Sequence, residues 1–317
     1  MLLIVSNKDD LAADFMITRL EELSLDYFRL DSEDAVSLNY SVNCDSSGSD
    51  VVLRGEARGF SRAQVGAVWY RRAIYPVGLE GIADDFKRFA AQELRHLLEG
   101  LLPETDDVIW VNPIGATERA ERKVRQLVLA PLYGLQIPPT IISGDSNELR
   151  AFAKHHRRII CKPISQGLVA TRSQWSSVHT WEVMADDLAE IAACGFPTLL
   201  QELVPKGVDI RLTLIGDRAF PVAIETEPGA DIDWRSSRNQ LVYRPCSLPE
   251  IVIDNCKKFL AALGLVYGAF DFVQSPEGEL FFLEVNPAGE WAWLELQLGL
   301  PLRDAFIHLF NMRQADR

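Results

Sequence analysis

Apolar and polar positions along this chain follow two different periods, and each period predicts a kind of element. Residues 1–6 form an almost continuous apolar run, which favours a buried strand. Residues 9–23 place apolar side chains near helical spacing, and residues 27–30 return to an extended pattern. A strand, a helix and a second strand in this order are typical of a small parallel α/β unit.

The remaining pattern predicts more strands and helices, with the strand signals concentrated in the second half. Before the linker Val111-Asn112-Pro113 we expect strands at 51–54 and 67–70, a loop at 43–49 and a helix at 84–98. After it we expect helices at 116–134 and 249–263, a helical region at 290–313, and strands at 158–163, 198–204, 209–215, 219–225, 240–244, 266–274 and 279–285. The helix after the linker should end at Gly134. The predicted fold class is α+β and α/β.

Length and composition describe an ordinary globular protein. The chain has 317 residues, which at roughly 150 residues per domain corresponds to two or three domains. Lysine and arginine number 32 and aspartate and glutamate 45, so the formal net charge is −13. Sequence-independent nucleic-acid binding depends on clustered basic residues, so this balance argues against a nucleic-acid partner.

The cysteines and the apolar runs favour a cytoplasmic protein. The five cysteines are widely spaced and odd in number, as expected of reduced thiols. No run approaches about 18 consecutive apolar residues, so no membrane partner is expected. The N-terminal run has no basic segment before it, which favours a strand over a signal peptide.

The strongest chemical signal is a predicted hairpin between residues 266 and 287. Residues 276–279 (PEGE) supply its turn. Glu284 and Asn286 are two residues apart and share a face of their strand, and Asp271 can lie opposite them if the strands pair. Two carboxylates and an amide oxygen are hard ligands suited to Mg²⁺. The alternative is a hairpin with a few surface acids, but Glu284 sits within an apolar run where an uncompensated charge is costly.

Two lysines and one polar stretch are further candidates. Lys162 ends an apolar strand, where a compact cation is well placed for phosphate. Lys123 lies on a highly charged helix, and a solvated helix face is its simplest explanation. The stretch Gln201–Arg211 combines a strand edge, a turn at Gly207, an aspartate and an arginine, which suits a base, a ribose and a phosphate. Taken alone, this stretch is better explained as a charged β-turn.

The order of these elements resembles the ATP-grasp superfamily of carboxylate ligases. A helix lysine, a strand lysine, Q-E-x-V followed by D-I-R, a further arginine, and then D with E-x-N occur in the superfamily's order over residues 112–290. The resemblance implies an ATP-grasp fold of three parts. These are an N-terminal pre-ATP-grasp α/β domain over 1–111, a central subdomain over 112–200 and a C-terminal subdomain with the metal site over 201–317.

The resemblance also implies site roles, with ATP and two Mg²⁺ ions as cofactors. Lys123 and Lys162 contact the α- and β-phosphates, the adenine is bordered by Gln201, Glu202, Leu203 and Val204, Asp209 binds the ribose, and the magnesium ions are held by Asp271, Glu284 and Asn286. The catalytic cations are Lys162, Arg211 and an arginine at the transferring phosphate. For that arginine we favour Arg235 and keep Arg238 as the alternative. The loop after Lys162 departs from the superfamily, because it retains only Gly167.

Two details resemble the graspetide synthetases, which crosslink ribosomally made peptides. They are Val68-Trp69-Tyr70-Arg71-Arg72 and the G-x-W-x-W-x-E tail that follows E-x-N-P. The resemblance implies that Asp or Glu side chains of a precursor peptide, made of a leader and a core, are activated as acyl-phosphates and joined to Ser or Thr hydroxyls or Lys amines. Trp291 and Trp293 can equally be core residues. For Arg71 and Arg72 we favour pairing with the chain's own acids.

Other functions and surfaces stay open at the sequence level. One alternative is an ATP-grasp ligase that adds an amino acid or an amine to a protein terminus or a small carboxylate. Another is a non-catalytic nucleotide-binding regulatory subunit, which the complete set of site residues argues against. A homodimer is also considered. For the leader we expect a docking surface in 209–245 and 249–263, where basic residues concentrate, namely Arg211, Arg218, Arg235, Arg238 and Arg244. These arginines can instead pair with neighbouring acids.

Overall fold

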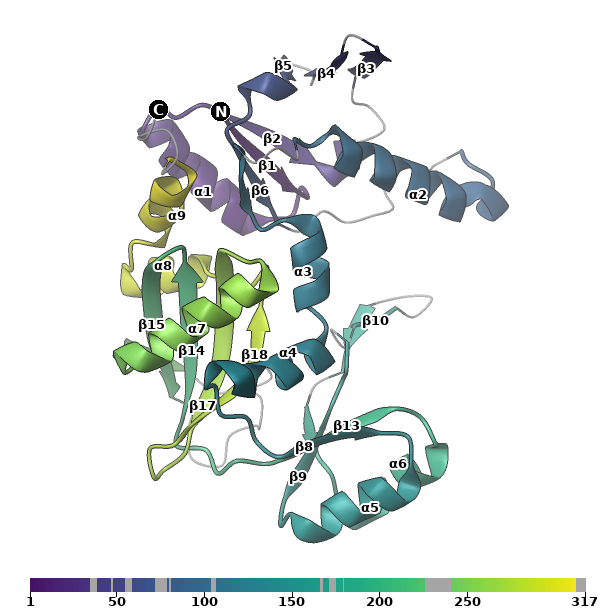
Figure 1. Ribbon diagram of the computed structural model, residues 1–317, viewed down its shortest axis with the longest axis vertical. Helices are drawn as coiled ribbons and strands as arrows, with labels where there is room; N and C mark the ends of the chain where they lie inside the picture. Colours follow the sequence, from purple (N-terminus) through teal and green to yellow (C-terminus); the bar gives the residue numbers. More distant parts are fainter. Residues whose placement is uncertain are drawn as a thin grey trace. The chain divides into compact units, whose positions relative to one another are not determined.

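In the computed structural model the chain forms two compact units, and each unit is assembled from segments that are not consecutive in the sequence (Figure 1). It describes the chain except for residues 35–38, 47, 55–58, 72–78, 80, 104–106, 166–167, 171–174, 179, 226–240 and 312–317. Unit 1 comprises Met1–Ile114, Leu265–Tyr267 and Glu290–Arg317, and unit 2 comprises Gly115–Gly264 and Gly268–Gly289. The three-part division expected from the sequence stays a prediction. The tail Glu290–Arg317 belongs to the same unit as Met1–Ile114 and Leu265–Tyr267.

Unit 1 is built on a parallel sheet of order β2-β1-β6-β7. Its strands are β1 (Leu2–Ser6), β2 (Tyr27–Asp31), β6 (Ala67–Tyr70) and β7 (Ile109–Val111). Helix α1 (Leu11–Glu22) follows β1, and the Asp10 side chain caps it by accepting from the N–H groups of Ala12 and Ala13. The predicted strand–helix–strand opening is therefore confirmed.

The remainder of unit 1 departs from the sequence prediction at one place. Helix α2 (Asp84–Leu101) and the short 3₁₀ helices η1 (Ser32–Asp34) and η2 (Arg62–Gln64) are accompanied by a three-stranded antiparallel sheet. This sheet contains β3 (Asn39–Asp45), β4 (Gly48–Arg54) and β5 (Gly59–Ser61). The loop expected at 43–49 is wrong, because β3 and β4 pair through it. Tyr40, Val42 and Cys44 alternate with polar residues along β3, but the Asn, Asp, Ser and Gly residues at 43–49 are typical of a loop. Every side chain of β3 is exposed, so no burial marks this strand.

The C-terminal tail completes the core of unit 1. The predicted helical region is two helices, α8 (Ala292–Leu298) and α9 (Leu302–Asn311), separated at Gly299, which has a positive φ. Trp291 is fully buried, with its ring centroid 6.3 Å from that of Trp69 and 5.2 Å from that of Phe306. Core packing is thus the observed role of the first tryptophan in the tail motif.

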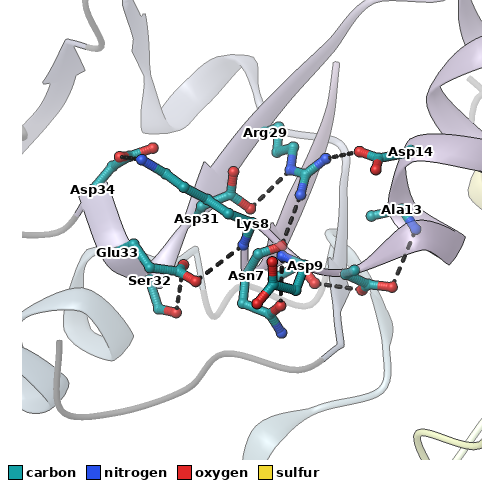
Figure 2. A network of polar contacts seen from close by, with 12 residues as sticks. Asn7, Lys8, Asp9, Ala13, Asp14, Arg29, Asp31, Ser32, Glu33 and Asp34 are labelled. Atoms are coloured by element: carbon teal, nitrogen blue, oxygen red, sulfur yellow. Dashed lines mark hydrogen bonds and ion pairs between the residues drawn. The ribbon is translucent and has the colours of Figure 1, made fainter.

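A polar network ties the strand ends of unit 1 together (Figure 2). The Arg29 guanidinium donates to Asp31 at 2.8 Å, to Asp14, and to the backbone carbonyl of Asn7 at 2.7 Å. Lys8 pairs with Asp34, and its backbone N–H donates to Glu33. The network thus links β2 to α1 through Asp14 and to the end of β1 through Asn7, and links Lys8 to η1.

Unit 2 begins with a helical segment that the sequence pattern treats as one helix. The structure has α3 (Ile114–Ala120), α4 (Lys123–Leu129) and the 3₁₀ helix η3 (Ala130–Tyr133). The single helix expected over 116–134 is therefore wrong at residues 121–122, although Gly134 ends the segment with a φ of 71° as predicted. The break makes Lys123 the first residue of a new helix.

An antiparallel sheet of order β12-β9-β13-β8 follows. It contains β8 (Thr140–Ser143), β9 (Ile159–Lys162), β12 (Trp181–Glu182) and β13 (Thr198–Glu202), and β10 (Leu168–Ala170) pairs with β11 (Trp175–Ser177) beside it. Helices α5 (Ser146–His155) and α6 (Ala185–Cys194) cover one face of the sheet (Figure 1). Leu149, Ile159 and Leu200 are among the buried side chains between these layers.

The second sheet of unit 2 has five antiparallel strands in the order β16-β15-β14-β17-β18. They are β14 (Val208–Ile215), β15 (Arg218–Glu225), β16 (Val242–Pro245), β17 (Tyr267–Gln274) and β18 (Leu280–Asn286), and all were predicted within a few residues. Helix α7 (Glu250–Leu263) lies across one face (Figure 1). Its Phe259 packs against Phe270 and Phe282 of the hairpin, with ring centroids 6.1 and 5.4 Å away.

The charged core of unit 1 is a buried ion pair between Asp10 and Arg71. Arg71 Nε donates to Asp10 at 2.7 Å, and both side chains are 2% exposed. Ser6 also donates to Asp10, and Arg71 reaches Glu290 at 3.0 Å. Burial works to raise the pKa of Asp10, but the Arg71 guanidinium and the Ser6 hydroxyl bring that pKa below its usual value. This supports the structural explanation for Arg71; Arg72 lies outside the described residues.

Replacing Asp10 should therefore cost stability in a pH-dependent way. We expect Asp10→Asn to lower the free energy of unfolding by about 3 kcal/mol at pH 7, the scale of breaking a buried ion pair. Because the folded pKa is depressed, the contribution is complete above the unfolded value of about 3.9 and disappears as pH falls through the folded value. Urea unfolding of wild type and variant between pH 3 and 7 measures this difference. Exposed Asp9→Asn is the control, and an equal loss in both variants contradicts the prediction.

Candidate functional site

The hairpin of β17 and β18 brings the two expected metal carboxylates opposite each other. Asp271 is the register partner of Glu284, and a bulge follows between Asp271 and Phe272. Asn286 lies two residues beyond Glu284 on the same face. Its Oδ1 atom accepts from the Ala288 N–H at 3.0 Å, which fixes the orientation of the amide. The predicted pairing across the 276–279 turn is confirmed; the metal role stays a prediction.

A cation from the neighbouring strand compensates the first carboxylate. Arg211 on β14 donates from Nη1 to Asp271 Oδ1 at 2.9 Å, and both side chains are 7% exposed. Strand β14 lies directly beside β17, so the arginine reaches across one strand spacing. Arg211 is therefore buried and turned to the hairpin.

The glycine of the tail motif leaves room for this arginine. A Cβ atom on Gly289 would lie 2.7 Å from Arg211 Nη2 and 2.6 Å from the Ala269 Cβ. Both distances are shorter than nonbonded contacts allow, so a side chain at this position must displace the guanidinium or the strand. The glycine of the G-x-W-x-W-x-E motif is therefore required sterically at this position, apart from the motif's resemblance to a family.

A lysine from α4 compensates the second carboxylate. Lys123 Nζ lies 3.5 Å from Glu284 Oε2 and donates to the Pro163 carbonyl at 2.9 Å. The Lys123 and Glu284 side chains are 21% and 23% exposed, so the lysine is not on a solvated helix face. Its two contacts join the helix, the end of β9 and the hairpin. The structure therefore brings together Lys123, Glu284 and, through register, Asp271.

The donor chemistry of this corner fits a divalent cation. Two carboxylates and one amide oxygen are hard oxygen ligands of the kind that Mg²⁺ prefers. Within the part of the chain that the structure describes, no three His, Cys, Asp or Glu side chains converge on one point. The oxygen donors that the structure offers here are therefore those of Asp271, Glu284 and Asn286.

The second predicted lysine is held in a hydrogen-bonded chain. Lys162 Nζ at the end of β9 donates to Gln201 Oε1 at 2.7 Å, and Gln201 Nε2 donates to Thr140 Oγ1 at 2.8 Å. These residues belong to β9, β13 and β8, which are adjacent in one sheet. Lys162 thus emerges from an apolar strand with its ammonium oriented by Gln201, as its sequence position indicates.

The end of β13, which the sequence predicts to border the adenine, is held by backbone hydrogen bonds. Glu202 and Leu203 donate their backbone N–H groups to the carbonyls of Pro139 and Arg158, each at 2.9 Å. The Glu202 carboxylate lies 3.2 Å from His156 Nδ1, and Asp209 lies 2.8 Å from Lys206 Nζ. The segment that includes Val204 is therefore positioned by β13 at one end and β14 at the other.

Some predicted basic residues are placed differently or lie outside the described residues. Arg235 and Arg238 fall within 226–240, and Gly167 falls within 166–167, neither of which the structure describes. Arg211 is buried against Asp271, so its assignment to an exposed leader-docking surface is wrong. Arg244 is exposed and lies 3.2 Å from Glu225, which is the pairing considered as the alternative.

Sequence reasoning missed two residues that shape this site. Gln126 is buried in α4 and hydrogen-bonds to the backbone of Val285, between the expected metal ligands. Thr140 anchors Gln201. No pattern singles out a glutamine on a charged helix or a threonine opening a strand, because their partners are backbone or side-chain groups distant in sequence.

Comparison with known proteins gives this geometry a context. Residues 1–118 match a family model described as the MvdD pre-ATP grasp domain. The chain is 25% identical over 225 residues to a tetrahydromethanopterin:alpha-L-glutamate ligase of Methanococcus maripaludis, covering 68% of this chain and 72% of that protein. Both comparisons concern ATP-grasp architecture or ligases.

Solved structures resemble the chain over nearly its whole length. The macrocyclase MdnC of Microcystis aeruginosa, solved with its precursor peptide MdnA, is 26% identical, with 98% of each chain covered and a TM-score of 0.85. A RiPP-associated ATP-grasp ligase of Chryseobacterium gregarium, solved with ADP and a leader and core peptide, is 23% identical, covering 100% of this chain and 97% of that chain at a TM-score of 0.87. The expected ATP-grasp fold is confirmed.

The close approach at Gly289 predicts a specific sensitivity of the site. We expect Gly289→Ala to lower the free energy of unfolding by about 2 kcal/mol, the scale of overpacking a tight core position. Gly100→Ala is the control, since a Cβ there meets no atom within 4 Å and alanine favours the helix that contains it. Urea unfolding compares them, and a Gly289→Ala variant as stable as Gly100→Ala contradicts the steric argument.

Proposed function

Because the chain is an ATP-dependent ligase that belongs to the ATP-grasp superfamily and resembles the graspetide synthetases, we propose that its substrate is a ribosomally made precursor peptide. The enzyme activates Asp or Glu side chains of the core and joins them to Ser or Thr hydroxyls or Lys amines of the same peptide. The full-length likeness to a macrocyclase that binds its precursor supports this choice of substrate.

One observation within the molecule carries the proposal. The hairpin presents Asp271 opposite Glu284, and each of these carboxylates has a cation from a different element, Arg211 at 2.9 Å and Lys123 at 3.5 Å. Such an arrangement combines metal ligands with cations at one place, which is what transfer of a phosphoryl group requires. It is more than a structural ion pair needs, since Asn286 adds a third oxygen donor on the same face.

The residues take distinct roles in this proposal. Asp271, Glu284 and Asn286 hold two Mg²⁺ ions, and Lys123 and Lys162 bind the α- and β-phosphates of ATP. Magnesium, when bound, neutralises charge on the phosphates and aligns them for transfer. As the resemblance to ATP-grasp ligases implies, the adenine lies along Gln201 to Val204 and Asp209 binds the ribose. Arg211 and Arg235 are the remaining cations, Arg238 being the alternative to Arg235.

The reaction needs no covalent protein nucleophile. An oxygen of the core carboxylate attacks the γ-phosphorus of ATP, the bond to the β–γ bridging oxygen breaks, and an acyl-phosphate and ADP form. A hydroxyl or amine of the core then attacks the acyl carbon, loses its proton and expels inorganic phosphate, which leaves an ester or an amide. The protein contributes alignment and positive charge where the negative charge of the phosphoryl group accumulates.

The direct test uses the short peptide, rich in Thr and in Asp or Glu, that an adjacent open reading frame is expected to encode. Incubation with ATP and MgCl₂ should remove one water from the peptide mass for each bond formed. Modification of a protein terminus or of a free amino acid instead would favour the alternative ligase, and ATP binding without any product would favour a regulatory subunit. The expected homodimer and the cytoplasmic location stay predictions; among the helices of the described ranges, none is long and apolar enough to cross a membrane.

Removing one charge from the metal site should suppress turnover. We expect Glu284→Gln to lower kcat at least about a hundredfold, the scale of losing one preorganised electrostatic contact in a transition state. Glu279→Gln, exposed at the turn of the same hairpin, is the control. Product formation is followed by mass spectrometry at saturating MgCl₂. Near-normal turnover of Glu284→Gln would refute the metal assignment.

Removing the strand lysine should act mainly on nucleotide binding. Lys162→Met keeps the length of the side chain but deletes its charge, so we expect affinity for a non-hydrolysable ATP analogue to fall about tenfold, as for a charged hydrogen bond. Isothermal titration measures the affinity, and Lys154→Met on the exposed side of α5 is the control. Unchanged affinity in a folded Lys162→Met variant means that this lysine only orients Gln201.

A further inference from the structure

Gln126 connects the helix of the phosphate lysine to the strand of the metal ligands. Gln126 is 3% exposed and is the middle residue of α4. Its Oε1 atom accepts from the Val285 N–H at 2.8 Å, and its Nε2 atom donates to the Val285 carbonyl at 2.8 Å. The second proton on Nε2 goes to the Ala120 carbonyl at 2.7 Å. One amide group thus makes three short hydrogen bonds to the backbone.

Val285, the residue to which Gln126 hydrogen-bonds, lies on an edge strand of the sheet. Strand β18 is at the edge of the five-stranded sheet, so alternate residues direct their N–H and C=O groups away from β17. Val285 is one of these residues, and the Gln126 amide takes the place that a further strand would occupy. Because Val285 stands between Glu284 and Asn286, the clamp fixes the piece of backbone from which both proposed metal ligands project.

The same amide also fixes the lysine. Lys123 and Gln126 are three residues apart on α4 and share a helix face. Gln126 contacts Val285 while Lys123 lies 3.5 Å from Glu284, so the two contacts run along neighbouring residues of β18. The bond to Ala120 closes the end of α3 at the break that makes Lys123 the first residue of its helix.

We propose that Gln126 is a positioning residue of the nucleotide and metal site, which sets Lys123, Glu284 and Asn286 in register by clamping Val285. This proposal rests on the proposed function, since the register matters only if these residues hold phosphate and Mg²⁺. The glutamine itself touches neither. Leucine at this position would fill much of the same volume but leave the Val285 groups and the Ala120 carbonyl without their bonds.

The test measures ADP binding by isothermal titration at increasing MgCl₂ in the full chain. We expect Gln126→Leu to raise the MgCl₂ concentration for half-maximal ADP binding about tenfold, the lower range seen when groups that orient metal ligands are removed. Gln126→Glu should do the same, because a second oxygen then faces two carbonyls. In turnover with the precursor peptide, KM for ATP should rise as well.

A matched control separates positioning from stability. Leu263→Ala removes a buried side chain of α7, elsewhere in unit 2. It should lower Tm at least as much as Gln126→Leu while leaving the MgCl₂ dependence within about twofold of wild type, since it truncates packing alone. If Gln126→Leu keeps the wild-type MgCl₂ dependence, or if Leu263→Ala shifts it equally, the positioning role is wrong.

The Glu284→Gln variant in the same titration separates failure of the Gln126 clamp from failure of the metal assignment. If it abolishes the MgCl₂ dependence and Gln126→Leu does not change it, the metal site stands and the clamp fails. If Glu284→Gln leaves the dependence unchanged, the metal assignment and therefore the clamp both fail.

Discussion

Two facing carboxylates on one hairpin are the constraint on which the rest of this site depends. Asp271 and Glu284 are register partners, so their negative charges repel each other, and Asp271 is buried. The fold offsets this repulsion with Arg211 from β14 and Lys123 from α4. Each cation comes from an element that lies directly against the hairpin, β14 beside β17 in the sheet and α4 against β18.

Two glycines and one buried amide allow neighbouring segments to lie close to the hairpin. Gly289 carries no side chain where the Arg211 guanidinium needs space. Gln126 hydrogen-bonds to the backbone groups of Val285 at the edge of β18, where no further described strand pairs with them. Gly207 has a similar function at the other end of the hairpin. Its N–H donates to the Gln274 carbonyl at 2.9 Å, and a Cβ there would meet the same carbonyl oxygen at 2.9 Å. Backbone proximity at these places is what lets charged groups from separate elements meet.

The sequence predicted most of this fold, because long apolar patterns determine strands and helices. It predicted the hairpin and its facing acids from the turn residues and the two-residue period. It missed β3, whose side chains are all exposed, and the break before Lys123, because the pattern of apolar positions continues through it. Arg211 was recognised as a candidate, but its burial against Asp271 depends on strand order, which local periodicity does not contain.

In the function that we propose, these cations serve transfer of the γ-phosphoryl group to a carboxylate. The most direct test is an isotope experiment with a precursor peptide whose core Asp and Glu side chains carry a heavy oxygen isotope. Mass spectrometry of the inorganic phosphate then follows the label. We expect one labelled oxygen in phosphate for each ester or amide formed, with ADP as the nucleotide product. Bond formation with unlabelled phosphate, or with AMP as the product, would contradict it.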